Sequence, residues 1–148
     1  MTARALMIIV RSVTGTEIRP GTELGRRVFI DRGSAVVTGE TARVGDDVTM
    51  YHQVTLGGVG WWHDNGRAVG QPRHPVIGEG VVLGTGATVL GRVTVADGRV
   101  VGARTLVVRD VPAKARVHPR PHLRRGALPH TPQGAIELLR RTASSGSW

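Results

Sequence analysis

Residues able to carry out chemistry gather in one glycine-rich segment, residues 57–75. It contains adjacent tryptophans, a histidine beside them and an arginine–histidine–proline cluster: Trp61, Trp62, His63, Arg73, His74 and Pro75. Loops that leave a rigid scaffold commonly carry function. Tryptophans in such a loop are expected to cover a ligand or a neighbouring subunit, and a solvent-exposed loop without a role is the alternative. The chain has no cysteine, which excludes a thiol nucleophile, a disulfide framework and a cysteine-based zinc site.

The sequence is strongly basic, with 20 Lys and Arg against 11 Asp and Glu in 148 residues and a net charge of +9. The excess lies at the end, since residues 112–148 contain seven basic side chains and one acid. Nucleic-acid binding would need bases interleaved with aromatic residues, which this tail lacks apart from Trp148. Its apolar face is too short for a membrane surface. A small anionic ligand fits the charge best, because arginine suits phosphate and carboxylate.

The sequence predicts one soluble domain. The length suits a single core, and a hydrophobic content of 40% is close to the globular average. The longest apolar run near the start, residues 5–10, is six residues long, too short for a membrane helix, and no small-residue cleavage site follows it. We therefore expect a cytoplasmic protein.

Aliphatic residues recur every six positions through the body of the chain. Three runs keep this spacing: Ile18, Leu24, Ile30 and Val36; Val44, Met50 and Leu56; and Ile77, Leu83, Val89, Val95, Val101 and Val107. The period fits neither an amphipathic helix nor a simple alternating strand. It is typical of a left-handed parallel β-helix, in which three six-residue sides make one triangular coil. The sequence therefore predicts this all-β fold; a β-sandwich, which needs no such spacing, is the alternative.

The six-residue register breaks twice, first between Val36 and Val44 at residues 39–41, and then between Leu56 and Ile77. The second break coincides with the glycine-rich segment of residues 57–75, which we expect to leave the β-helix as a loop. Solenoids need caps at their ends, and a threonine–proline pair followed by apolar residues predicts a late helix. The expected parts are a cap (residues 1–13, a short strand or helix), the β-helix (14–112), and a basic strap with a short C-terminal helix (113–148).

Several motifs, in their order along the chain, resemble the serine acetyltransferase family. They are residues 14–21, residues 30–42 with Gly-Glu-Thr-Ala, residues 50–58 with Val-Thr-Leu-Gly-Gly, and the Arg-His-Pro of residues 73–75. The match covers roughly residues 14–112, including both register breaks. Hexapeptide repeats alone also occur in γ-class carbonic anhydrases, whose metal needs three converging histidines. The motifs match the acetyltransferases better, so no metal is expected.

The resemblance implies an acyltransferase with acetyl-CoA as the acyl donor and a small amino-acid-like acceptor. It also implies a homotrimer with active sites between subunits. Glycines would let the donor's pantetheine arm pass close to the backbone, and an arginine would suit the acceptor's carboxylate. The positions carried over are Gly57, Gly58, Thr85 and Ala103 for the cofactor groove, Arg73 and His74 facing the acceptor, and Asp31 for its amino group.

Three departures from the family pattern concern the catalytic centre and the ends of the chain. The position of the family's catalytic histidine holds Arg32, whose guanidinium is always protonated and cannot act as a base. The aspartate that orients that histidine corresponds to Glu17, so the resemblance implies a Glu17–Arg32 salt bridge or anion clamp. The family's helical N-terminal domain is essentially absent before the repeat, and residues 116–122 replace the segment that closes over CoA.

Acyl transfer to a hydroxyl without a general base loses about 10²–10⁴-fold in rate. His74 is the first candidate to replace that base, with binding the acceptor as its alternative role; His52, His63 and His118 are the others. An amine, hydroxylamine or hydrazine acceptor needs no strong base, because its neutral nitrogen attacks the thioester directly. The sequence therefore predicts a serine-acetyltransferase-like enzyme with an altered catalytic centre formed by Glu17, Arg32 and His74. A non-catalytic trimeric binding or scaffold protein is the alternative.

Overall fold

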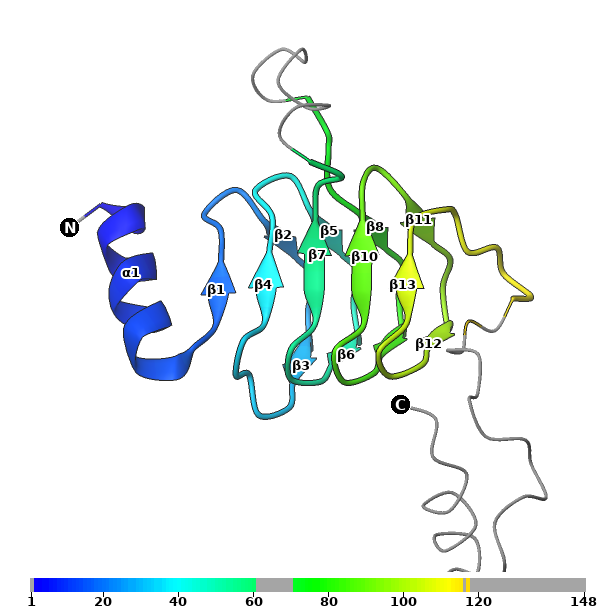
Figure 1. The fold of residues 1–148 in the computed structure, drawn as a ribbon, viewed down its shortest axis with the longest axis horizontal. Coiled ribbons are helices and arrows are strands. Elements are labelled where there is room, and N and C mark those ends of the chain that lie inside the picture. Colours follow the sequence, from blue (N-terminus) through cyan, green and yellow to red (C-terminus); the bar gives the residue numbers. More distant parts are fainter. Residues whose placement is uncertain (1, 61–70, 116, 118–148) are drawn as a thin grey trace, which may run out of the picture.

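The computed structural model describes residues 2–60, 71–115 and 117. Its short strands all pair in parallel and form the three sides of a prism, coil stacked on coil (Figure 1). Sheet A contains β1 (Glu17–Ile18), β4 (Val37–Thr38), β7 (Thr55–Gly57), β10 (Thr88–Leu90) and β13 (Leu106–Val107). Sheet B contains β2 (Glu23–Leu24), β5 (Arg43–Val44), β8 (Val76–Ile77) and β11 (Thr94–Val95). Sheet C contains β3 (Phe29–Ile30), β6 (Thr49–Met50), β9 (Val82–Leu83) and β12 (Val100–Val101).

The residues spaced by six form columns inside the prism. In sheet C the pairing aligns Ile30, Met50, Leu83 and Val101, one above the other. Met50, Leu83 and Val101 are fully buried. Small aliphatic side chains fill a narrow prism without aromatic residues, because each one packs against its equivalents in the neighbouring coils. The predicted left-handed parallel β-helix is thereby confirmed.

The first register break lies earlier than predicted. Thr38 is aligned with Leu56 in sheet A and is fully buried, so it occupies the inward position that we had assigned to Val36. The main-chain N–H groups of Asp31 and Gln53 bond the carbonyls of Met50 and Ser34. This alignment leaves Arg32 and Gly33 without counterparts in the next coil. The two extra residues are therefore at the turn before β4, not at residues 39–41, because Thr38 and not Val36 completes the column.

The connections between sheets form three corners, named here by the sheets that they join. Among the described residues, the A–B corner comprises residues 19–22, 39–42, 58–60, 71–75 and 91–93. The B–C corner comprises residues 25–28, 45–48, 78–81 and 96–99, and the C–A corner comprises residues 31–36, 51–54, 84–87 and 102–105. At the B–C corner the coils approach so closely that a Cβ on Gly25 would lie 2.4 Å from the carbonyl carbon of Gly45. Glycine is therefore required at this turn.

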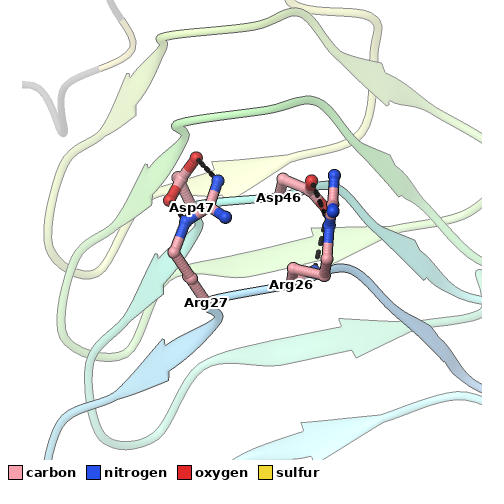
Figure 2. A network of polar contacts seen from close by, with 4 residues as sticks. All are labelled: Arg26, Arg27, Asp46 and Asp47. Carbon is pink, nitrogen blue, oxygen red and sulfur yellow. Dashed lines mark hydrogen bonds and ion pairs between the residues drawn. The ribbon is translucent and has the colours of Figure 1, made fainter.

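Ion pairs link the first two coils at the B–C corner (Figure 2). The Arg27 guanidinium donates to both carboxylate oxygens of Asp47, at 2.6 and 2.7 Å, and the main-chain N–H of Arg26 donates to Asp46 at 2.7 Å. The hydrogen bond from Arg27 lowers the pKa of Asp47, and the N–H of Arg26 lowers the pKa of Asp46. These exposed contacts favour the stacked coils most where both carboxylates are ionised.

A helix forms at the N-terminal end, where a strand was the alternative. Helix α1 (Ala3–Thr14) lies beside β1 and ends at Gly15, whose φ of 70° is left-handed. None of its residues is buried, and Ile8 and Val13 remain 59% and 80% exposed. The helix therefore contacts the first coil without sealing the open end of the prism.

The stack continues past the predicted end of the repeat at residue 112. Val111 pairs with Val95, and Val117 pairs with Val101, six residues later. The predicted C-terminal helix and most of the basic strap lie outside the described residues, as do Trp61, Trp62 and His63. Within the part of the chain that is described, no helix has the length and apolar character needed to cross a membrane.

Candidate functional site

A pocket of about 250 Å³ opens at the A–B corner, where three successive coils meet. It contains four of the side chains or glycines that the sequence singled out: Glu17, Gly57, Arg73 and His74. Segments separated by up to 57 residues thus contribute to one pocket, because each coil returns the chain to the same corner. Its full lining is Glu17, Arg19, Val37, Thr38, Gly39, Glu40, Leu56, Gly57, Arg73 and His74.

Two larger hollows lie beside helix α1. One, of about 340 Å³, is almost entirely apolar and has no titratable side chain in its lining: Ala3, Leu6, Met7, Val10, Thr16, Ile18 and Pro20. The other, of about 470 Å³, is bordered by Arg4, Arg19 and Glu40 at the helix start. Neither brings a histidine together with an arginine, so the pocket at the A–B corner is the better candidate for chemistry.

The carboxylate of Glu17 is held by two guanidinium groups. Glu17 is only 7% exposed, and its Oε2 lies 2.8 Å from Nη1 of Arg11 on α1. Its Oε1 lies 3.0 Å from Nε of Arg19. A nearly buried carboxylate needs such partners to offset its loss of hydration. Arg11 and Arg19 are therefore the partners of Glu17 among the described residues, and the expected Glu17–Arg32 pair is not formed.

His74 is almost completely buried, at 8% exposure, and is held from one side by Thr41. The main-chain N–H of Thr41 lies 3.2 Å from Nδ1 of His74, and Oγ1 of Thr41 lies 2.8 Å from the same nitrogen. Oγ1 also accepts the main-chain N–H of Arg73, at 3.0 Å. One threonine therefore connects the backbone of Arg73 to the ring of His74.

Glycine at position 39 makes room for that ring. A Cβ added to Gly39 would lie 2.0 Å from Cδ2 and 2.1 Å from Nε2 of His74. Real Cβ atoms do not come so close to another heavy atom, so the ring could not stay where it is. Gly39 and Thr41, which the sequence had not assigned to the site, thus fix the position of His74. Their occurrence in the Gly-Glu-Thr-Ala motif was the available signal.

The other predicted site residues lie at the C–A corner. Asp31 is half-buried and Arg32 is exposed, with a φ of 53° in the left-handed region. Among the residues that the structure describes, no carboxylate lies within 4 Å of the Arg32 guanidinium. Thr85 and Ala103 occupy the same corner two and three coils further on, and the N–H of Arg104 bonds the carbonyl of Thr85.

The two groups of residues stand at opposite ends of the strands of sheet A. β4 begins after the turn that contains Asp31 and Arg32, and it ends just before Gly39. Gly57 and Gly58 likewise lie at the end of β7, on the same side as His74. One protomer therefore does not bring Asp31, Arg32, Thr85 and Ala103 together with Arg73 and His74.

Three other histidines were candidates for the general base, and of these the structure describes only His52. His52 is half-buried at the C–A corner, and its Nδ1 is inaccessible to solvent and has no hydrogen-bond partner within the described residues. His63 and His118 lie outside those residues. In residues 2–60, 71–115 and 117, no three His, Asp or Glu side chains are grouped closely enough to hold a metal ion.

The chain is similar to curated serine acetyltransferases, although no family model matches it. It is 49% identical over 115 residues to the serine acetyltransferase of Mycobacterium tuberculosis, covering 78% of this chain and 47% of that protein. It is also 49% identical over 110 residues to the enzyme of Helicobacter pylori strain 26695, covering 74% and 60%. The chain thus spans about half the length of the curated relatives it matches.

Solved serine acetyltransferase structures share the fold. Isoform 3 from Entamoeba histolytica, in complex with cysteine, superimposes with a TM-score of 0.72 at 34% identity, covering 90% of this chain and 45% of that one. The Brucella abortus protein in complex with coenzyme A gives 0.71 at 37% identity, covering 80% and 45%. Sequence and fold agree on the same group of proteins.

Proposed function

Because the chain belongs to the serine acetyltransferase family, we propose that it transfers an acetyl group from acetyl-CoA to a serine-like amino acid or a related amine or hydrazine. The observation that carries the proposal is the pocket at the A–B corner, in which Arg73 and His74 stand beside acidic Glu17 and Glu40. Opposite charges in one small pocket suit a zwitterion such as an amino acid.

The acceptor's carboxylate is assigned to Arg73 and His74. Arg73 is exposed at the mouth of the pocket, where its guanidinium can offer two parallel N–H groups to a carboxylate. Within one protomer, the acceptor's amino group is assigned to the carboxylate of Glu40, which lines the same pocket. Glu17 already pairs with two arginines, and Asp31 lies at another corner.

The acyl donor, acetyl-CoA, is assigned to a groove lined by small residues whose backbone is accessible. Gly57 is half-buried in the pocket. At the C–A corner Thr85 is half-buried and Ala103 is exposed, so a narrow chain could pass close to each of these three residues. Bound there, acetyl-CoA would supply an activated acetyl group as a thioester. This donor is a cytoplasmic metabolite, which supports a cytoplasmic location for the reaction.

A homotrimer would bring the two corners together. The cofactor positions fall at both ends of the strands of sheet A, so one protomer alone cannot line a continuous groove with all of them. A groove between two protomers could be lined by Gly57 and His74 of one chain and by the C–A corner of the next. We therefore propose that the site is complete only in the oligomer.

The altered centre favours a nitrogen nucleophile. The acceptor's oxygen or nitrogen attacks the thioester carbonyl carbon, the C–S bond breaks, and the proton lost by the acceptor ends on the thiol. A hydroxyl needs a base for this step, which Arg32 cannot provide, whereas an amine or hydrazine with a neutral nitrogen does not. A serine-like hydroxyl acceptor would depend on another residue for proton removal.

Thiol release from acetyl-CoA tests the proposal. Serine, homoserine, simple amines and hydrazine are offered to the full chain, and CoA binding is measured by calorimetry. Replacing Arg73 by alanine removes a charge-assisted contact and is expected to raise the KM for amino-acid acceptors about 10–100-fold. Arg43→Ala is the matched control, because that exposed arginine pairs with Glu23 on sheet B, outside the pocket.

Two results would contradict the proposed function. Absence of turnover with every acceptor, together with absence of CoA binding, would leave the non-catalytic scaffold protein as the better interpretation. Equal effects of the Arg73 and Arg43 substitutions would show that the pocket does not bind the acceptor. Light scattering on the purified chain tests the trimer separately.

A further inference from the structure

We propose that Thr41 is a positioning residue that fixes His74 as the tautomer with its proton on Nε2. His74 then gives a hydrogen bond to the acceptor and does not take the acceptor's proton. The role of His74 toward an acceptor rests on the proposed function, whereas the tautomer is a property of the free protein.

The main-chain N–H of Thr41 determines which ring nitrogen is unprotonated. It lies 3.2 Å from Nδ1 of His74 and can only donate, so Nδ1 must offer its lone pair. A neutral imidazole carries one proton, which is therefore on Nε2. A proton on Nδ1 would face the N–H of Thr41 directly, with two hydrogens between two nitrogens.

The hydroxyl of Thr41 acts in the same direction. Its Oγ1 accepts the main-chain N–H of Arg73 at 3.0 Å, so one lone pair is occupied. Its own hydrogen remains available for Nδ1 of His74, 2.8 Å away. Two donors of a single residue thus converge on Nδ1, and the chain of bonds runs from the Arg73 backbone through Thr41 to the ring.

The surroundings of the ring oppose a reversed orientation. A ring turned by 180° would direct its Cδ2–H at the donors of Thr41 and would exchange two good hydrogen bonds for two repulsive contacts. His74 is only 8% exposed and its ring lies against Gly39, so little space is available for other arrangements. The orientation and the tautomer are therefore set together.

The tautomer decides what His74 can do. With its proton on Nε2, the ring is a hydrogen-bond donor, suited to a carboxylate or to the negative oxygen that develops during acyl transfer. A general base would need a lone pair on that nitrogen, hence a proton on Nδ1, which Thr41 opposes. His74 is thereby moved from the first candidate for the base to a binding group.

Nitrogen NMR of the histidine side chains tests the tautomer without any substrate. The full chain is labelled with ¹⁵N-histidine, the His74 signals are assigned by their loss in His74→Asn, and spectra are recorded near pH 8. We expect a non-protonated Nδ1 and a protonated Nε2. A protonated Nδ1 would overturn the proposal whether or not the protein transfers acetyl groups; the expected pattern without any turnover would refute only the proposed function.

Variants of Thr41 separate a positioning role from a purely structural one. Thr41→Val keeps the shape and the main-chain N–H but loses the hydroxyl, whereas Thr41→Ser keeps both donors. We expect the valine variant to lower kcat/KM about five-fold and to shift His74 Nδ1 towards protonation, with recovery in the serine variant. Equal signals in all three proteins would refute the role of the hydroxyl.

The pH dependence of kcat/KM in His74→Gln tests whether His74 acts as a base. Glutamine places an amide N–H near the position of Nε2, so His74→Gln should keep a measurable part of the activity and the pH dependence of kcat/KM that the unsubstituted chain shows. The pocket's charged Glu17, Arg19, Glu40 and Arg73 are present in both proteins, so the comparison changes only the imidazole. Loss of one limb of the profile in this variant would identify His74 as a base and refute the proposal.

Discussion

Substitution of Gly39 by alanine tests whether the close approach of the His74 ring is needed. The added Cβ would lie 2.0 Å from Cδ2 of the ring, and ordinary contact begins at 3.4 Å. The ring must therefore move by about 1.4 Å, and a displacement of this size at a reacting centre can cost about 10²-fold in rate. The φ of Gly39 is not in the left-handed region, so alanine adds no backbone strain there.

The assay measures acetyl transfer, CoA binding and thermal unfolding on the same preparation. We expect Gly39→Ala to lower kcat/KM about 100-fold, to destabilise the fold by about 1–3 kcal/mol through overpacking, and to leave CoA binding within about two-fold. The matched control is Gly98→Ala at the B–C corner, where space is open but φ is 62°. It should lower stability without lowering kcat/KM. Unchanged kcat/KM and unchanged His74 signals in Gly39→Ala would refute the packing argument.

Three further predictions follow from the catalytic position, the ion pairs and the core. Arg32→His restores a group that can act as a base, so O-acetylation of serine should rise by about 10-fold or more; no gain in a variant that still binds CoA would contradict the inference that the missing base at position 32 limits this reaction. The lowered pKa of Asp47 means that its pairing with Arg27 stabilises the fold above the ordinary value of 3.8 and is lost as pH falls through the lowered pKa. Asp47→Asn should therefore reduce the fall in Tm between pH 5 and pH 3, and an identical fall in both proteins would exclude this contribution. Leu56→Ala should cost about 2–5 kcal/mol by leaving a cavity in a filled column. Thr38→Val, one coil away, keeps the volume and loses only the hydroxyl contact with Thr22, so it should cost about 0.5–1.5 kcal/mol; denaturant unfolding that ranks them in reverse order would contradict the column arrangement.

The fold could be predicted because its signal is periodic. Aliphatic residues at every sixth position leave few architectures in which all of them face inward, and the columns through Met50 and Leu83 confirm the prediction. The location of the first break could not be predicted, since Val36 and Thr38 are both small enough for the column. Pairing with the neighbouring strands selected Thr38.

The candidate site was predicted only in part. Glu17, Gly57, Arg73 and His74 meet in one pocket, but Asp31, Arg32, Thr85 and Ala103 lie at another corner of the same protomer. The corner that a residue occupies depends on where each coil contains extra residues, and spacing in the sequence does not show where these residues lie. The two extra residues Arg32 and Gly33 lie at the C–A corner, whereas β7 ends and β8 begins at the A–B corner, so spacing alone does not place the site.

The sequence by itself determined that this chain stacks aliphatic residues in coils of a parallel β-helix, because a repeat of six is typical of that geometry and fits neither a helix nor an alternating strand. It also determined that no proton can be taken up by position 32, since an arginine is always charged. The tertiary structure alone decided that Glu17 pairs with Arg11 and Arg19, and that Thr41 directs two donors at His74. Partners and tautomers depend on distances between coils, and a carboxylate or an imidazole binds whichever groups the fold brings within about 3 Å.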